Sequence, residues 1–318
     1  MKNDFPFKMP LSAFGCKYDA GMERGGHGFI GGAVNSLAES KACPTCEAPL
    51  KQCRDISYYY LNSSNKPKPI RTKKEIYIYH GTERATKRAK DSALYSYTSI
   101  CNGEMFLGWM SGEKDQISSF WKLLKKSDKV KDGEDDSKLQ CNLRIGRAKK
   151  RRGYLKCTMK LVTHGCEPET VHPLFYSEAY PSLRDDGLLI IVLQTPAIIL
   201  CNELFRPVTT FESDNIFSDC SFKESISKQN DKEFSATSII DGWSGIHRLP
   251  RVPDVAISEG STFSFKLENS SIDDNAKREL ENELAKIQAS GIGERKNEGY
   301  GQILINPPFH RGEGKWRP

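Results

Sequence analysis

The sequence has no apolar run long enough to span a membrane. Its longest one, Leu188 to Leu200, is broken by Gln194 and Pro196. The N-terminus also lacks the layout of a secretory signal peptide, because Asp4 and Pro6 interrupt any apolar core there. We therefore expect a cytoplasmic protein, whose thiols stay reduced. Its ten cysteines are then predicted to be free thiols or metal ligands rather than a disulfide framework.

Acidic residues are missing from a stretch in which basic residues are dense. Positions 144–160 hold eight Lys or Arg and no acid, and positions 66–90 hold nine Lys or Arg against two Glu. The 318-residue chain as a whole carries a formal net charge of +6, with 37% hydrophobic and 28% charged residues, which is a soluble globular composition. A single basic run is usually a solvated surface. Two such runs, both beside glycine and tyrosine, favour a nucleic-acid partner.

Two segments of the chain share the pattern Ile-x-x-Gly-x-x-Phe, at positions 100–106 and 257–263. Each is followed by residues of strand type, an amphipathic helix, a basic glycine-rich loop and another strand. The helices are predicted over 115–126 and 272–289, where apolar residues recur at spacings of three and four. Strand, helix, loop and strand form the second half of a β-α-β-β-α-β unit. We therefore predict an α+β fold with two ferredoxin-like, RRM-like units.

Only the second unit has a clear opening strand, over 188–200. The region before the first unit reads as loops, a cysteine cluster and a short aromatic run. We therefore expect that unit to be incomplete, with its opening strand and helix supplied by something else, a separate chain being one possibility. The Ser-, Asp- and Asn-rich stretch 206–233 is expected to be an irregular surface insertion. The predicted divisions are an N-terminal segment with a zinc-knuckle insertion, a first unit, a linker, a second unit and a tail, at 1–75, 76–164, 165–187, 188–309 and 310–318.

Each glycine-rich loop combines glycines, cations and a tyrosine. A dinucleotide-binding loop follows a strand and opens a helix, whereas here the helix comes first, and the Gly-Lys-Ser/Thr ending of a P-loop is missing. Glycine leaves peptide N–H groups free to point at phosphate oxygens, and tyrosine offers a stacking face. A tight turn with solvated charges explains one loop equally well, but two in the same order favour RNA. The residues predicted to bind RNA are Gly146, Arg147, Lys149, Lys150, Arg151, Arg152, Gly153 and Tyr154 in the first loop and Gly291, Gly293, Arg295, Lys296, Gly299, Tyr300 and Gly301 in the second.

The segment Gly291-Ile-Gly-Glu-Arg-Lys-Asn-Glu-Gly-Tyr-Gly301 resembles the C-terminal glycine loop of the RAMP superfamily, the backbone subunits of CRISPR effector complexes. Residues 239–261 are similar to the second RAMP domain of the subunit specific to type III-D systems, and 93–106 with 145–154 resemble its first domain. The resemblance covers nearly the whole chain and is most specific at the C-terminal loop. Two features depart from the family. The first loop lacks the usual last glycine, and the family's opening strand with its glycine-arginine helix is missing before Asp4.

The resemblance implies a subunit that binds guide RNA at its 5′ handle. Its partners would be other RAMP backbone subunits, the large polymerase-like subunit and, in the assembled complex, target RNA. We therefore predict a non-catalytic RNA-binding backbone subunit of a type III CRISPR ribonucleoprotein. A RAMP endoribonuclease using His80, His247 or Asp241, and a protein scaffold that touches no RNA, are the alternatives. Outside the loops, the residues predicted to bind RNA are His80, Arg84, Lys87, Arg88, Trp243, Arg248 and Arg251.

Cys43-Pro-Thr-Cys46 has the spacing of a zinc knuckle. Zinc takes four soft or borderline ligands, and a small loop-rich insert gains its fold from the metal. We predict a structural zinc site formed by Cys16, His27, Cys43 and Cys46, with Cys53 as the alternative ligand. Ordinary cytosolic thiols are the competing interpretation. The other cysteines are scattered, several of them at strand positions, and are expected to pack in the core.

Overall fold

The structure is a computed structural model. By its contacts the chain divides into two compact units, Met1–Phe106 with Leu174–Pro318 and Leu107–Pro173, and each is described by itself. Among the residues described, no helix is both long and apolar enough to cross a membrane. The description leaves out residues 1–5, 18–28, 32–41, 44–45, 54–56, 62–66, 71, 83–88, 107, 109, 111, 128–129, 133–136, 146–152, 162–182, 185, 202–203, 211, 219, 230–232, 245, 269–273, 312–314 and 317–318.

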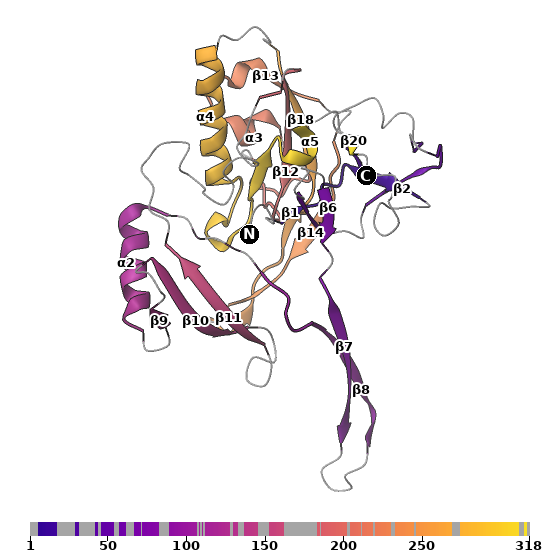
Figure 1. The fold of residues 1–318 in the computed structure, drawn as a ribbon, viewed down its shortest axis with the longest axis vertical. Helices are drawn as coiled ribbons and strands as arrows, with labels where there is room; N and C mark the ends of the chain where they lie inside the picture. Colours follow the sequence, from indigo (N-terminus) through magenta and orange to yellow (C-terminus); the bar gives the residue numbers. More distant parts are fainter. Residues whose placement is uncertain are drawn as a thin grey trace. The chain divides into compact units, whose positions relative to one another are not determined.

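The larger unit contains a four-stranded antiparallel sheet in the strand order β13-β18-β12-β19 (Figure 1). Along the chain its elements run β-α-β-β-α-β, which is the ferredoxin-like order predicted for 188–309. The opening strand is shorter than the predicted 188–200, because the chain bends at Gln194 and Pro196 follows, a residue with no N–H for a ladder. The elements are β12 (Leu188–Leu193), α3 (Ser213–Phe217), β13 (Ile226–Lys228), β18 (Thr262–Leu267), α4 (Asp274–Ser290) and β19 (Ile303–Ile305).

The stretch 206–233 is therefore not an irregular insertion, as its composition suggested. It contains α3 and β13, which are the first helix and second strand of the ferredoxin-like unit, and a 3-10 turn at Lys223–Ser225. These elements are short, and only a few of their residues point inward. Ile216, Phe217, Cys220 and Ile226 are buried in the main core cluster, and Val208 and Phe222 pack against it, so apolar side chains hold this polar stretch on the sheet.

Both faces of the sheet are covered, which explains why β12 is a continuous apolar run. On one face, Leu189 and Ile191 share a core cluster with Leu280 and Leu284 of α4. On the other face, Leu188, Ile190 and Val192 form a cluster of their own. All six residues of β12 are buried.

The N-terminal segment lies on that second face. Thr262 pairs with Val192 in the strand register, so the two side chains share a face. The Thr262 hydroxyl lies 3.3 Å from the hydroxyl of Ser12, which is 3.1 Å from Nε2 of His310. Leu11 donates its backbone N–H to the carbonyl of Gly260 at 2.7 Å. The segment is thus fixed to the sheet by hydrogen bonds between buried groups.

Two small sheets complete the N-terminal region. One has the order β1-β5-β6, and its Tyr59 packs between Phe7 and Phe309, with ring centroids 5.4 and 5.6 Å away. The other has the order β20-β3-β2-β4, so a strand from the predicted tail joins strands of the N-terminal segment. The elements are β1 (Phe7–Lys8), β2 (Ala13–Cys16), β3 (Phe29–Gly31), β4 (Leu50–Gln52), β5 (Tyr58–Leu61), β6 (Pro67–Ile70), α5 (Pro308–Arg311) and β20 (Lys315–Trp316).

The larger unit also contains two hairpins. The longer one, β7 with β8, is a two-stranded antiparallel hairpin (Figure 1). Four tyrosines stack on one of its faces, as in the Tyr79–Tyr97 pair with ring centroids 5.2 Å apart. The other, which we call the arm, is inserted between β13 and β18 and spans residues 237–257. The strands of the two hairpins are β7 (Lys74–Thr82) and β8 (Ala89–Ile100), and β14 (Thr237–Ile240), β15 (Trp243–Ser244), β16 (Leu249–Pro250) and β17 (Asp254–Ile257).

The smaller unit contains one helix and a three-stranded antiparallel sheet in the order β11-β10-β9. Helix α2 (Lys114–Lys125) confirms the helix predicted over 115–126. The strands are β9 (Val130–Asp132), β10 (Lys138–Arg144) and β11 (Tyr154–Lys160). The first glycine loop therefore joins two strands, and the prediction that it joins a helix to a strand is wrong.

The reason is the sequence of β10 itself, where Leu139 and Cys141 alternate with exposed residues and form a half-buried strand. The segment after Gly103 also differs from the repeat, since residues 104–106 form no strand. That 76–164 form an incomplete ferredoxin-like unit stays a prediction, as do the predicted divisions of the chain.

Candidate functional site

The second glycine loop connects α4 to β19, as predicted, and is closed by backbone hydrogen bonds. Ile292 donates its N–H to the carbonyl of Gly301 at 2.9 Å, and Gly301 donates to Pro196 at 2.8 Å. Glu294 donates to the carbonyl of Ile198, also at 2.8 Å. The loop is thus folded onto the segment that leaves β12, so the ferredoxin-like sheet fixes its position.

The glycines of this loop mainly serve the packing of the protein itself. Gly301 has φ +72°, and a Cβ there would overlap the carbonyl oxygen of Ile292. Gly293 meets the carbonyl of Ile198 in the same way, and a Cβ on Gly291 would lie 2.8 Å from the carbonyl oxygen of Gly301. We expected these glycines to leave peptide N–H groups for phosphate. Instead, the N–H groups of Gly291 and Gly301 donate to carbonyls of the chain.

Gly299 is the exception in the loop. Its φ is +90°, but a Cβ placed on it would meet nothing within 4 Å. Lys296 lies three residues before it and Tyr300 directly after it. Lys296 is exposed and Tyr300 is half-buried. The open side of the loop is therefore the part around Gly299.

The first glycine loop is closed by the same pair of residue types. Ile145 donates its N–H to the carbonyl of Gly153 at 2.8 Å, and a Cβ on Gly153, at φ +76°, would overlap the carbonyl oxygen of Ile145. Gly153 is thus the counterpart of Gly301 rather than of Gly299. The first loop does have its closing glycine, and Tyr154 follows that glycine with 68% of its surface exposed.

The basic tips of two hairpins lie outside the described residues. They carry the predicted RNA-binding residues Gly146, Arg147, Lys149, Lys150, Arg151 and Arg152 of the first loop and Arg84, Lys87 and Arg88 of the β7–β8 hairpin. The strands that lead to both tips are described. RNA contact by these residues stays a prediction.

Two arginines predicted to bind RNA are held in a network of ion pairs. Nη1 of Arg251, from the arm, lies 3.0 Å from both carboxylate oxygens of Glu298 in the loop. Arg295 binds the same carboxylate through Nε at 3.1 Å and Nη2 at 2.8 Å, and its Nη1 binds Asp254 at 2.8 Å. Its guanidinium also lies over the ring of Tyr300, 4.9 Å from the centroid.

The ion pairs of this network shift the pKa values of Glu298 and Arg295. Hydrogen bonds from Arg295 and then Arg251 lower the pKa of Glu298 to about 2. The bond to Glu298 also raises the pKa of Arg295 above its ordinary value, and the bond to Asp254 adds to this. Our sequence reasoning named the two cations but missed their acids. The spacing of Arg295 and Glu298, three residues apart, was the available signal.

The remaining predicted residues lie on the hairpins. Trp243 and Arg248 are exposed on the arm, Trp243 by 62%, and His80 is exposed on β7. His247 and Asp241, the other groups considered for catalysis, are also exposed on the arm. Across the described residues no hydrogen bond or ion pair joins His80, His247 and Asp241. In the described structure, therefore, no two of these residues form an acid–base pair.

The helix-free face of the ferredoxin-like sheet is covered by the N-terminal segment and is not accessible to nucleic-acid bases. RRM domains stack bases on aromatic side chains of this face, but here Ser12, Tyr59 and Phe309 of the covering layer are fully buried. The middle strands β12 and β18 are buried along nearly their whole length. A nucleic acid would have to use the loops and hairpins.

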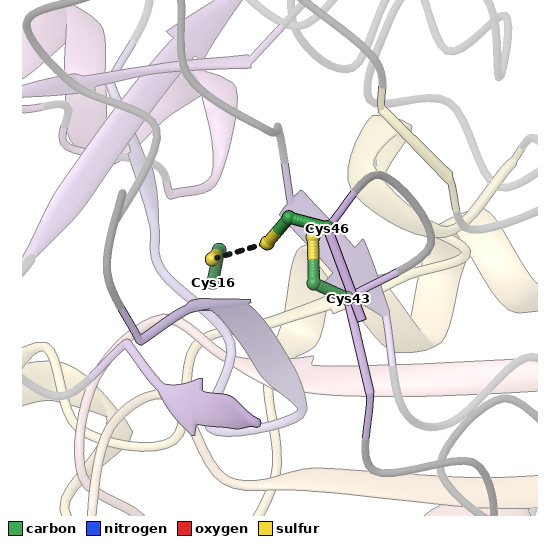
Figure 2. Close-up of side chains that lie close together, drawn as sticks. All are labelled: Cys16, Cys43 and Cys46. Carbon is green, nitrogen blue, oxygen red and sulfur yellow. Dashed lines mark hydrogen bonds between the residues drawn. The ribbon is translucent and has the colours of Figure 1, made fainter. Parts of the chain in front are cut away.

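Three cysteines of the predicted zinc knuckle come together (Figure 2). The sulfurs of Cys16, Cys43 and Cys46 all lie within 4.8 Å of one another, and those of Cys16 and Cys46 are 3.5 Å apart. Cys16 ends β2, and the N–H of Glu47, at φ +58°, donates to the carbonyl of Cys43 to close the knuckle. Cys53, the alternative ligand, is outside this group.

The thiols of the cluster suit a soft cation. A hydrogen bond with the backbone of Ala48 lowers the pKa of Cys46, but desolvation and the thiols of Cys16 and Cys43 raise it, and the net pKa is above the ordinary value. Three sulfurs at this distance repel one another as thiolates, and a divalent metal removes that repulsion. Cys16 and Cys43 are buried and Cys46 is exposed. The donor set fits zinc, with His27, outside the described residues, as the predicted fourth ligand.

No protein-family model matches the chain, and no curated protein matches it. Among solved structures, it is similar to Cas6 of Thermus thermophilus, with 12% identity and a TM-score of 0.28 over 48% of this chain and 66% of that one. It is also similar to a chain of the Type III-B Cmr-beta complex bound to cognate target RNA, with 13% identity and a TM-score of 0.30 over 70% of this chain and 54% of that one. Each neighbour thus extends well beyond the part that this chain matches. Likeness at this level establishes no shared function.

Proposed function

We propose that this chain is a non-catalytic RNA-binding backbone subunit of a type III, III-D-like, CRISPR effector ribonucleoprotein. The observation that carries the proposal is the ferredoxin-like unit whose glycine loop lies between α4 and β19 and is closed by Ile292 and Gly301. The resemblance of residues 291–301 to the RAMP glycine loop supports the same assignment. In this proposal the subunit binds the 5′ handle of guide RNA and contacts other RAMP subunits and the large polymerase-like subunit.

The covered sheet favours loops and hairpins as the surface that would hold the RNA. Because the N-terminal segment occupies the helix-free face, RNA bound to the larger unit would contact the open side of the loop near Gly299 and the arm. The exposed Trp243 of the arm and Tyr154 of β11 would offer stacking surfaces. The exposed Lys296 and the basic tip at 147–152 would supply charge for phosphates.

The test is to purify the complex from its host through a tag on this chain and to sequence the RNA that comes with it. We expect guide RNAs that share one repeat-derived end. Binding of such an RNA to the purified chain should weaken with salt, by about 0.7 in log K per log salt for each phosphate contacted. A complex that contains protein partners and no RNA would overturn the proposal in favour of a scaffold.

We also propose that Cys16, Cys43 and Cys46, with His27, hold a structural zinc ion. Bound there, zinc would supply no chemistry to a substrate, because four protein ligands leave no open position. It would join the end of β2 to the knuckle at 43–46, two parts of the chain that bury little apolar surface together beyond Ala48 and Leu50.

A further inference from the structure

Glu298 is shared by two arginines from different parts of the larger unit. One is Arg251, which follows β16 of the arm, and the other is Arg295, within the glycine loop. The carboxylate of Glu298 accepts four N–H contacts of 2.8–3.1 Å from these two side chains. The arm and the loop are therefore joined by this carboxylate.

Each guanidinium nitrogen of Arg295 already contacts a carboxylate. Its Nε and Nη2 bind Glu298, and its Nη1 binds Asp254 at the start of β17. Its side chain is 22% exposed and lies over Tyr300. Its backbone, at φ +55°, is in the left-handed region that side chains rarely adopt. Turning Arg295 toward a phosphate would break both ion pairs.

Arg251 differs in this respect. Only its Nη1 takes part in the network, and within the described parts of the chain its Nε and Nη2 have no partner. The side chain is 43% exposed. The free edge of a guanidinium presents two parallel N–H groups, the geometry that binds two oxygens of a phosphate.

On the basis of the proposed function, we infer that Arg251 contacts a backbone phosphate of the bound RNA, whereas Arg295, Asp254 and Glu298 are positioning residues that hold its free edge in place. Glu298 orients Arg251 directly, and Asp254 holds Arg295 so that Arg295 can orient Glu298. The two arginines carry the same charge but have different roles.

Substitution of Glu298 tests the inference, because the two possible roles of Glu298 change the affinity for RNA in opposite directions. Glu298→Gln removes a negative charge from a surface that binds a polyanion. If Glu298 were a bystander, RNA would bind more tightly, by about twofold to tenfold. If Glu298 holds Arg251 in place, RNA binds more weakly, by about fivefold to tenfold. We expect the weaker binding, measured as the Kd for a guide RNA at fixed salt.

Arginine variants separate contact from positioning. Arg251→Lys keeps the charge but loses the free edge, and we expect Kd to rise about tenfold. Arg251→Gln should also reduce the salt slope by about 0.7, one phosphate contact. Arg295→Gln should weaken binding and lower the melting temperature of the protein. Arg278→Gln, the same change on the exposed face of α4, is the matched control and should leave Kd unchanged.

The outcomes separate the two proposals. If the wild-type protein binds no RNA at any salt concentration, the proposed function fails and the roles of these residues fail with it. If the wild type binds RNA but Glu298→Gln binds more tightly, or Arg251→Lys binds as well as wild type, the proposed function stands and this inference is overturned. Arg251→Lys leaves the pair with Asp254 untouched, so it remains informative should Glu298→Gln fail to fold.

Discussion

Nε2 of His310 lies 3.1 Å from the hydroxyl oxygen of Ser12, although the two residues are 298 positions apart. Both side chains are fully buried. The Ser12 hydroxyl also meets Thr262, whose own hydroxyl donates to the carbonyl of Gly260 at 3.1 Å. This order of donors requires the His310 tautomer with the proton on Nε2, and Nδ1 has no partner among the described atoms.

The first prediction concerns pH. Burial, and then the charge of Arg184, lower the pKa of His310 to about 3. In the unfolded chain His310 has its ordinary pKa near 6.5. Below pH 6.5 the unfolded state therefore binds a proton that the folded state does not, and stability falls as pH falls toward 3. Between pH 6.5 and 5 this group should remove about 2 kcal/mol, measured by urea unfolding. His310→Gln should flatten this pH dependence, and an unchanged slope in that variant would contradict the assignment.

The second prediction concerns the closing glycines. Gly301→Ala must displace the carbonyl of Ile292 as well as adopt φ +72°, and we expect a loss of about 3 kcal/mol in the free energy of unfolding. Gly299→Ala has the same kind of φ but open space around the new methyl group, so its loss should be about 1 kcal/mol. Chemical denaturation of the full chain measures both. Equal losses would show that the overlap with Ile292 is unimportant.

The third prediction concerns zinc. Elemental analysis of the purified protein should find about one zinc per chain. Cys43→Ser and Cys46→Ser should lose the metal and lower the melting temperature, because the cluster joins the knuckle to β2. Cys53→Ser is the matched control, since its sulfur lies outside the cluster, and it should retain the metal. Loss of zinc from that control would make Cys53 a ligand after all.

The fourth prediction concerns nuclease activity. His80, His247 and Asp241 are exposed and are not joined to one another in the described structure. Replacing each by alanine should therefore leave any cleavage of labelled guide precursor or target RNA by the purified complex unchanged. A loss of more than about tenfold in the cleavage rate of one variant, with RNA binding intact, would instead support the endoribonuclease alternative.

The longest and most regular elements were predictable from the sequence. Helix α4 starts two residues after its predicted start and ends one after its predicted end, and α2 is shifted by one residue, because apolar stripes at spacings of three and four persist over several turns. Strand β19 and its loop were placed correctly for the same reason, since they follow a clear helix. The paired cysteines at 43 and 46 were recognisable from spacing alone.

The misses have physical causes. Helix α3 has five residues and β13 three, which is too short for a periodic pattern to stand out from a polar stretch. The loop glycines were found, but their purpose depends on contacts with residues distant in sequence, such as Pro196 and Ile198. The acids that pair with Arg251 and Arg295 were not predicted, because runs of like charge in the sequence do not show which charges pair. Pairing depends on where the arm and the loop meet.

The burial of Ser12 against Thr262 and His310 has a consequence for synthesis. A ribosome makes residue 12 early, but its buried partners emerge only about 250 and 300 residues later. At about 5–20 residues per second, the N-terminal segment waits roughly 15–60 s for the surface it will cover. During that time the hydroxyl of Ser12 lacks both of its native partners, Thr262 and His310. The N-terminal segment can therefore reach its native place only after nearly the whole chain has been made.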